Sequence, residues 1–304
     1  MLYNFRLGKY TCHTYLGAGA YGTVYGCTHD NGKLFAIKTF DSTKQKSYGN
    51  ELNYLNQLLA VPYVIQKHAH GFISYENIKS IIVLEKAEYD MQSLSLWKDR
   101  EDDEAHTMRK YFAQLALAIY GIHLKGIIHE DIKPGNILIM EEGRIAITDF
   151  GLSQSGQVFM SRWECKHEFQ AYYHPRMFGG TYFGNYVDWW AFGVILHQFF
   201  CDSKLPTNLY YFDYNDLVEC RQRSTYLPVG ILDLFILIFS SATYTSHSII
   251  GAPTPAIDEV TEATVAIGFQ IGCQIVNMEY FDLKTEPSWE DWKNACVEIQ
   301  RNKV

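Results

Sequence analysis

The sequence has no excess of basic residues. Of its 304 residues, 26 are Lys or Arg and 34 are Asp or Glu, which gives a formal net charge of −8. Proteins that bind nucleic acids usually carry a basic surplus, so direct binding of nucleic acid is not expected. Apolar residues make up 47% of the chain, which allows a sizeable core. The length suits one large domain or two small lobes that share a cleft.

The sequence also lacks paired cysteines. Its seven cysteines are scattered, their number is odd, and no two have C-x-x-C spacing. This pattern argues against a zinc site and against the disulfide framework of a secreted protein. We therefore expect each cysteine to be a small buried apolar residue in a reducing compartment, most simply the cytoplasm.

Long apolar runs are missing as well. Residues 231–239 are apolar but few, and residues 263–276 are interrupted by Gly and Gln. Neither segment reaches the ~20 residues that a membrane-spanning helix needs. The first ten residues lack the basic start and apolar stretch of a signal peptide. The sequence thus predicts core helices and no membrane association.

The pattern of secondary structure changes near residue 86. The residues before it are rich in β-branched and aromatic side chains and predict strands at 10–16, 23–28, 34–39, 72–74 and 80–85, with a helix at 47–60. The residues after it predict helices at 104–125, 186–200, within 208–240 and at 288–301, and a hairpin at 137–140 and 144–148. We expect a β-rich lobe at 1–86, a helical lobe at 87–245, and a divergent end at 246–304.

A glycine-rich run lies between the first two predicted strands. It reads G-x-G-x-x-G-x-V from Gly17 to Val24, and such a hairpin can cover phosphate groups with its backbone N–H groups. By itself the run could equally be an ordinary turn. Lys38 on the next strand needs an anionic partner if it is buried, and Glu51 on the following helix is the obvious candidate.

The segment His129–Asn136, HEDIKPGN, carries the most specific signal. Phosphoryl transfer needs a carboxylate near the attacking hydroxyl, a cation near the transferred group and an oxygen ligand for Mg²⁺. Asp131, Lys133 and Asn136 supply these three groups in order. The motif Asp149-Phe150-Gly151 follows the second hairpin strand and adds a further metal-binding carboxylate.

Together these residues resemble the eukaryotic protein kinase family over roughly residues 10–200. The resemblance implies an α+β bilobal protein kinase fold, with a small five-stranded antiparallel N-lobe carrying one helix and a larger, mainly helical C-lobe. Lys133, two residues after the catalytic Asp, matches the Ser/Thr kinases. The implied roles are catalytic for Asp131, Lys133, Lys38 and Glu51, and metal-binding, for Mg²⁺, for Asn136 and Asp149.

The resemblance also implies the residues that bind ATP. These come from the glycine run, from the positions that sandwich adenine, from the lysine strand and from the hinge, and they are Leu16, Gly17, Gly19, Gly22, Val24, Ala36, Lys38, Glu85, Ala87 and Leu138. Leu84 matches the gatekeeper before the hinge. Asp188 matches the buried Asp that braces the catalytic loop from a core helix.

Three departures from the family pattern bear on function. Glu130 replaces the usual Arg before the catalytic Asp, which makes this a non-RD type and predicts activity without phosphate on the activation segment. Arg176 replaces the Glu of the A-P-E motif, and we expect Glu259 or Glu262 as its partner. The Gly-Thr that precedes the substrate-binding turn is replaced by Glu168-Phe169, so the usual Thr contact to the catalytic Asp and Lys is missing.

The predicted function is that of an active Ser/Thr protein kinase that moves the γ-phosphoryl group of ATP to a protein substrate. A pseudokinase, or nucleotide-binding scaffold, is the alternative, although Lys38, Asp131 and Asp149 are all retained. A small-molecule kinase of related fold is a third reading. Residues 246–304 could end the C-lobe or dock a partner, and the oligomeric state is open. The departures fit a kinase encoded by a pathogen and acting in a host cell, and the nucleus is a further location that fits.

Overall fold

The computed structural model describes residues 2–19, 21–94, 102–141, 143–155, 158–160, 171–174, 177, 182–200 and 238. The chain separates into two compact units. The first consists of residues 1–92 and 135–153, and the second of residues 93–134 and 154–304.

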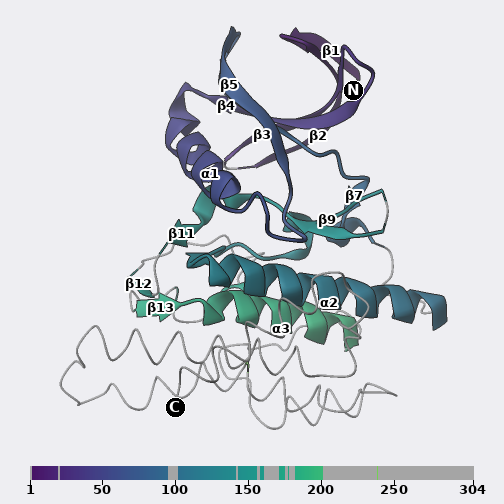
Figure 1. The fold of residues 1–304 in the computed structure, drawn as a ribbon, viewed down its shortest axis with the longest axis vertical. Helices are drawn as coiled ribbons and strands as arrows, with labels where there is room; N and C mark the ends of the chain where they lie inside the picture. The colour runs from purple at the N-terminus through teal and green to yellow at the C-terminus, as the bar shows by residue number, and fades with distance from the viewer. Residues whose placement is uncertain are drawn as a thin grey trace. The chain divides into compact units, whose positions relative to one another are not determined.

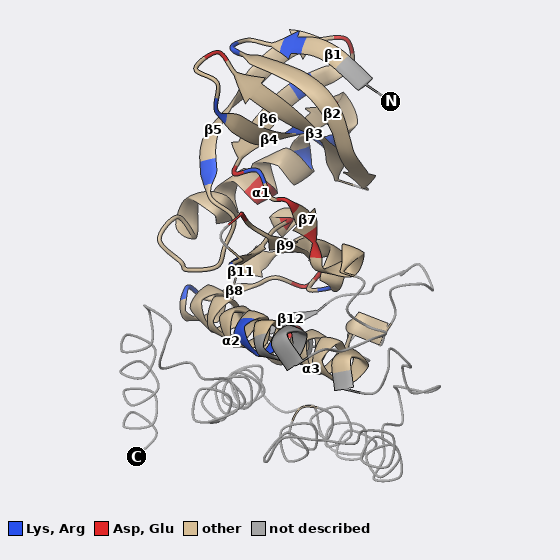
Figure 2. Cartoon of the chain, turned by 90° about the vertical axis from the view of Figure 1, so that its right-hand side faces the viewer, with Lys and Arg blue, Asp and Glu red and all other residues tan. Residues whose placement is uncertain are grey.

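A curled antiparallel sheet forms the body of the first unit (Figure 1). Its strands are β1 (Leu2–Leu7), β2 (Tyr10–Gly19), β3 (Gly22–His29), β4 (Leu34–Asp41), β5 (Lys67–Tyr75) and β6 (Ile78–Leu84), in the spatial order β1-β2-β3-β4-β6-β5. Residues Ala36 to Phe40 of β4 are buried without interruption, as expected for a central strand covered on both faces. Lys and Arg residues lie on several strands and turns of this sheet (Figure 2).

The sheet has six strands where the sequence predicted five. The extra strand, β1, pairs with β2 at the edge, with Phe5 opposite Cys12 and a bulge between Leu2 and Phe5. Six residues interrupted by a bulge do not keep a clean period of two, which is why the pattern of residues 2–7 did not predict a strand.

Cys12 and Cys27 are joined as a disulfide, so the expectation that every cysteine is a simple apolar residue is wrong for this pair. The two residues lie directly opposite each other on β2 and β3, and both are fully buried. Only the strand register brings together cysteines that are 15 residues apart, and spacing alone does not reveal that register.

One helix packs beside the sheet in the first unit, α1 (Gln45–Gln57) (Figure 1). Its buried residues are spaced three or four apart and form one face: Tyr48, Glu51, Tyr54 and Leu55. A glutamate therefore stands in the middle of the apolar face, which requires a cationic partner from the sheet or from a neighbouring segment.

A smaller sheet completes the first unit. It contains β7 (Tyr89–Asp90), β9 (Ile137–Ile139) and β10 (Ile145–Ile147), in the order β10-β9-β7. The short turns η1 (Ser42–Lys44), η2 (Met91–Ser93), η3 (Pro134–Asn136) and η4 (Phe150–Leu152) connect these elements. The predicted hairpin at 137–148 is present, and η4 contacts α1.

In the second unit, α2 (Asp102–Leu124) and α3 (Tyr186–Phe200) lie side by side (Figure 1). The Phe112 ring meets the rings of Phe192 and Phe199 edge-on, at centroid distances of 6.4 Å and 5.2 Å. Two short ladders accompany the helices: β8 (Ile127–Ile128) pairs with β11 (Gln154–Ser155), and β12 (Val158–Met160) pairs with β13 (Tyr182–Gly184).

The predicted elements within the described residues are present, and α3 has the predicted bounds. The helices predicted within 208–240 and at 288–301 lie outside the described residues. Among the residues that are described, no helix combines the length and the apolar character needed to cross a membrane.

Candidate active site

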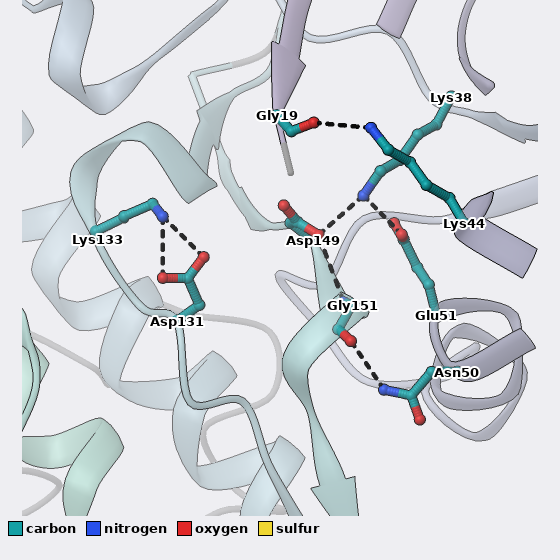
Figure 3. Close-up of polar contacts among 9 residues, drawn as sticks. All are labelled: Gly19, Lys38, Lys44, Asn50, Glu51, Asp131, Lys133, Asp149 and Gly151. Atoms are coloured by element: carbon teal, nitrogen blue, oxygen red, sulfur yellow. Dashed lines mark hydrogen bonds and ion pairs between the residues drawn. The ribbon is translucent and has the colours of Figure 1, made fainter. Parts of the chain in front are cut away.

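Lys38 forms two ion pairs inside the first unit. Its Nζ donates to Glu51 Oε2 at 2.6 Å and to Asp149 Oδ1 at 2.8 Å, so strand β4, helix α1 and the segment after β10 meet at one ammonium (Figure 3). Lys38 is 6% exposed and Glu51 is 1% exposed. Burial alone would lower the pKa of Lys38, but the charges of Glu51 and Asp149 more than offset that effect and raise it. The ammonium is therefore held in its charged form.

For Glu51, burial outweighs the ion pair and the pKa of the carboxyl is raised. Burial raises the pKa of its carboxyl, the Lys38 ammonium opposes that rise, and the negative charge of Asp149 adds to it. A buried carboxylate of this kind depends on its cation, because removing one partner of a buried pair leaves an uncompensated charge.

Asn50 connects α1 to the segment that carries Asp149. Its Nδ2 donates to the Gly151 carbonyl at 3.0 Å and to the Ser153 carbonyl at 3.1 Å. Asp149 itself has a left-handed backbone (φ 67°), and its carboxylate accepts from the Gly151 N–H at 3.4 Å. Sequence reasoning missed Asn50, because nothing in its spacing distinguishes it from a solvent-exposed helix residue.

The three glycines of the G-x-G-x-x-G run lie where β2 turns into β3. A Cβ at Gly22 would lie 2.8 Å from the Thr39 carbonyl oxygen and 3.3 Å from carbons of the Lys38 side chain, so this position requires glycine. A Cβ at Gly17 or Gly19 would meet nothing within 4 Å. Packing therefore does not require glycine at these two positions. The absence of a side chain there leaves the backbone accessible, so a ligand can approach it closely.

The residues expected to contact adenine all belong to the first unit. Leu16 is exposed on β2, Val24 and Ala36 lie on neighbouring strands, and Leu138 lies on β9, half-buried. The expected hinge residue Glu85 follows β6, with its carboxylate oxygens both 3.0 Å from Arg144 Nη2. Ala87 is half-buried two residues further on.

The two expected metal ligands belong to the first unit as well. Asn136 is buried at the end of η3, and its carbonyl accepts from the N–H of Thr148, the neighbour of Asp149, at 3.0 Å. Among the described residues, no three His, Cys, Asp or Glu side chains gather to hold a metal. At a nucleotide site, Mg²⁺ is usually held by one or two protein oxygens together with phosphate oxygens, and the side chains of Asn136 and Asp149 carry oxygens of that kind.

Asp131 and Lys133 form an ion pair in the second unit, within the loop that follows β8 (Figure 3). Lys133 Nζ lies 2.9 Å from Asp131 Oδ1 and 2.8 Å from Oδ2. Asp131 is buried, its backbone N–H donates to His129 Nδ1 at 3.2 Å, and its Oδ1 accepts from the Tyr173 hydroxyl at 2.7 Å. Sequence reasoning did not single out Tyr173.

Asp188 braces this loop from helix α3, as the resemblance predicted. Its Oδ2 accepts from the His129 N–H at 2.9 Å, and its Oδ1 accepts from the Glu130 N–H at 2.9 Å. The Nε2 of His123 lies 2.8 Å from Oδ2. Glu130 has a left-handed backbone (φ 66°), which costs about 1–2 kcal/mol for such a residue. The two hydrogen bonds from consecutive amides hold that conformation.

Glu130 is the residue that departs most from the family pattern in this loop. Its side chain is 3% exposed, and neither carboxyl oxygen meets hydrogen-bond geometry with any described residue. Burial raises the pKa of its carboxyl to about 8, the Gln154 side chain opposes this rise, and the charge of Asp188 adds to it. At neutral pH the Glu130 carboxyl is thus mostly protonated.

This buried acid gives the fold a pH-dependent stability. The folded state keeps the proton on Glu130 up to about pH 8, whereas a carboxyl with the ordinary value of 4.5 releases it much earlier. Between these values the folded state binds more protons, so the free energy of unfolding falls as the pH rises. We expect wild type to lose about 2–4 kcal/mol relative to Glu130→Gln between about pH 5 and pH 8.5.

Urea denaturation of both proteins across that range measures the difference. The Gln side chain has nearly the same shape and does not titrate, so it isolates the effect of the proton. Parallel stability curves for the two proteins would show that Glu130 releases its proton at an ordinary pH.

The remaining departures lie outside the described residues. These are Arg176, its expected partners Glu259 and Glu262, and the pair Glu168-Phe169.

The chain matches the family model described as "Protein kinase domain" over residues 10–223. This match covers more than half of the chain, and the fold and the residues above agree with it, so the chain belongs to the protein kinase domain family. The members of this family generally use ATP and Mg²⁺.

Individual relatives are kinases by name, and the first of them is named as a serine/threonine-protein kinase. The chain is 30% identical to a "RAC family serine/threonine-protein kinase homolog" of Dictyostelium discoideum over 193 residues, which are 60% of this chain and 42% of that protein. It is 30% identical to "CBL-interacting protein kinase 16" of Oryza sativa over 205 residues, 64% of this chain and 44% of that protein. It is 29% identical to human "Ribosomal protein S6 kinase alpha-4" over 200 residues, 60% of this chain and 25% of that protein. The matched region thus spans less than half the length of each relative.

Proposed function

We propose that this chain is a Ser/Thr protein kinase that transfers the γ-phosphoryl group of ATP to hydroxyl groups of protein substrates. The observation that carries the proposal is the buried ammonium of Lys38, held between Glu51 and Asp149 at 2.6 Å and 2.8 Å. A purely structural ion pair needs one partner. The second carboxylate, 26% exposed on its side chain, is the one suited to a metal ion.

In this proposal the residues of the first unit bind the nucleotide. Lys38 binds the α- and β-phosphates, and the backbone N–H groups of Gly17, Gly19 and Gly22 bind phosphate oxygens. Leu16, Val24, Ala36 and Leu138 pack on the adenine, and the backbone of Glu85 and Ala87 hydrogen-bonds its edge. Asn136 and Asp149 supply oxygen ligands for Mg²⁺. When bound, the ion neutralises phosphate charge as the phosphoryl group moves.

The residues of the second unit act on the substrate. Asp131 accepts the proton of the attacking hydroxyl, a role that requires a carboxylate within hydrogen-bond reach of it. Lys133, paired with both oxygens of Asp131, places a positive charge beside the transferred group.

The proposed division into lobes, at 1–86 and 87–245 with a divergent end at 246–304, follows the change of sequence pattern.

We also propose that the enzyme needs no phosphate on its activation segment. Kinases that need it receive the phosphate on a cation at the position of Glu130. Glu130 has no positive charge in either protonation state, and it is almost completely buried. It therefore offers no cation with which a phosphate could form an ion pair.

Phosphorylation of an array of Ser-, Thr- and Tyr-containing peptides tests both parts of this proposal. We expect transfer to Ser or Thr and, after complete dephosphorylation by a broad-specificity phosphatase, a turnover within about twofold of the untreated enzyme. Mass spectrometry verifies that the phosphate has been removed. A large loss of turnover after this treatment, restored by rephosphorylation, would show that the segment must be phosphorylated.

A further inference from the structure

A hydroxyl group from outside the catalytic loop contacts the proposed catalytic carboxylate. Tyr173 OH donates to Asp131 Oδ1 at 2.7 Å, and the two residues are 42 positions apart in the chain. The sequence comparison led us to expect no hydroxyl at the usual Thr position, where Phe169 stands. The contact is therefore made by a residue that no motif identifies.

The Tyr173 hydroxyl does something that Lys133 alone does not do. The Lys133 ammonium lies almost equally far from both oxygens of Asp131, at 2.9 Å and 2.8 Å. An ammonium that is nearly equidistant from both oxygens does little to resist smaller rotations of the carboxylate about its last torsion, which is soft. The hydrogen bond from Tyr173 acts on a single oxygen, Oδ1, away from the axis of that torsion, so it resists such rotations and holds the plane of the carboxylate.

The position of the Tyr173 ring is itself well determined. The ring is 8% exposed and belongs to an apolar cluster with Ile128, Met177, Phe183, Tyr186 and Val187. A phenol held in this way has few rotamers left to lose, and it can aim its hydroxyl better than a flexible side chain can.

The segment around Tyr173 is anchored on helix α3 at three points. Trp190 Nε1 donates to the Ala171 carbonyl at 3.2 Å, and the Tyr172 hydroxyl donates to Gln198 Oε1 at 3.0 Å. The His174 ring meets the Trp190 ring edge-on, at a centroid distance of 5.0 Å. Helix α3 also carries Asp188, which binds the backbone of the catalytic loop. One helix thus supports the loop backbone directly and the Asp131 side chain through Tyr173.

We propose that Tyr173 is a positioning residue that sets the orientation of the Asp131 carboxylate for proton acceptance from the substrate hydroxyl. This inference rests on the proposed kinase activity of the same site. The burial of the ring argues against a role as an internal phosphate acceptor, because the hydroxyl would have to leave the apolar cluster to react.

The test compares Tyr173→Phe with Tyr186→Phe, which removes a hydroxyl from the same cluster that is not bonded to Asp131. We expect Tyr173→Phe to lower kcat for peptide phosphorylation about tenfold, with the KM values for ATP and peptide within about twofold of wild type. Tyr186→Phe keeps kcat within about twofold. The amount of folded protein is measured by thermal unfolding and by the stoichiometry of nucleotide binding, and turnover is divided by that amount. A variant that only folds less well is then distinguished from one in which Asp131 is misoriented.

Other results have distinct meanings. Equal kcat values for Tyr173→Phe and Tyr186→Phe overturn the proposal. A higher kcat in Tyr173→Phe also overturns it, since the hydroxyl would then be a competitor of the substrate, and so does phosphate on Tyr173 of the wild-type enzyme. If wild type transfers no more phosphate than Asp131→Asn, the proposed kinase function fails, and this inference fails with it.

Discussion

Replacement of Asp131 by Asn is expected to lower kcat for peptide phosphorylation by a factor of about 10³, within the range of a lost general base. With its amide oxygen at the position of Oδ1, Asn can still accept hydrogen bonds from Lys133 and Tyr173. The variant loses the negative charge, the Lys133 contact to Oδ2 and the group that takes up a proton. The KM for ATP should change little, because no residue proposed to bind the nucleotide is altered.

Steady-state kinetics of purified wild type and Asp131→Asn measure this effect, with Asp30→Asn as the matched control. Asp30 forms an exposed ion pair with Arg6 at 2.8 Å, of a kind that contributes less than about 1 kcal/mol. Equal turnover by wild type and Asp131→Asn would rule out the proposed kinase activity. The alternative function, a nucleotide-binding scaffold, would then be favoured.

Replacement of Lys38 by Met is expected to abolish measurable phosphoryl transfer and to destabilise the fold by about 3 kcal/mol. Met has a similar length and apolar stem but no charge, so Glu51 is left buried beside Asp149 without its cation. The loss of activity follows from the loss of the proposed phosphate contact. The loss of stability follows from the two carboxylates that remain.

A double variant separates these two effects. Lys38→Met with Glu51→Gln replaces both members of the buried pair by neutral groups, and we expect it to recover much of the lost stability but none of the activity. Lys33→Met, an exposed lysine just before the same strand, is the control and should stay within about 0.5 kcal/mol of wild type. Activity in Lys38→Met close to that of wild type would contradict the assigned role of Lys38.

Much of the fold could be predicted because periodicity and turn chemistry act locally. The hairpin around Gly143 and helix α3 follow from a glycine turn and a continuous apolar run, and neither needs information from the rest of the chain. Strand β1 and the Cys12–Cys27 disulfide could not be predicted in this way. Both depend on which residues face each other across strands, and that is set by register.

The residues of the candidate site that could be predicted likewise differ from those that were missed in whether their role depends on tertiary contacts. Lys38 and Glu51 were paired in advance because a buried charge demands a partner, and the structure places them 2.6 Å apart. Asn50 and Tyr173 were missed because their roles arise from tertiary contacts with Gly151 and Asp131. For Glu130 the sequence indicated repulsion of phosphate by a negative charge, whereas burial makes the side chain a mostly neutral acid at ordinary pH.

The contacts of α1 with the Asp149 segment couple the positions of these two parts of the molecule. Any outward displacement of α1 would break the Lys38–Glu51 ion pair and both hydrogen bonds of Asn50 to Gly151 and Ser153 together. The position of α1 and the orientation of Asp149, the proposed metal ligand, are then set by the same equilibrium. A small molecule that favours the displaced helix would reorient the Asp149 carboxylate without touching it.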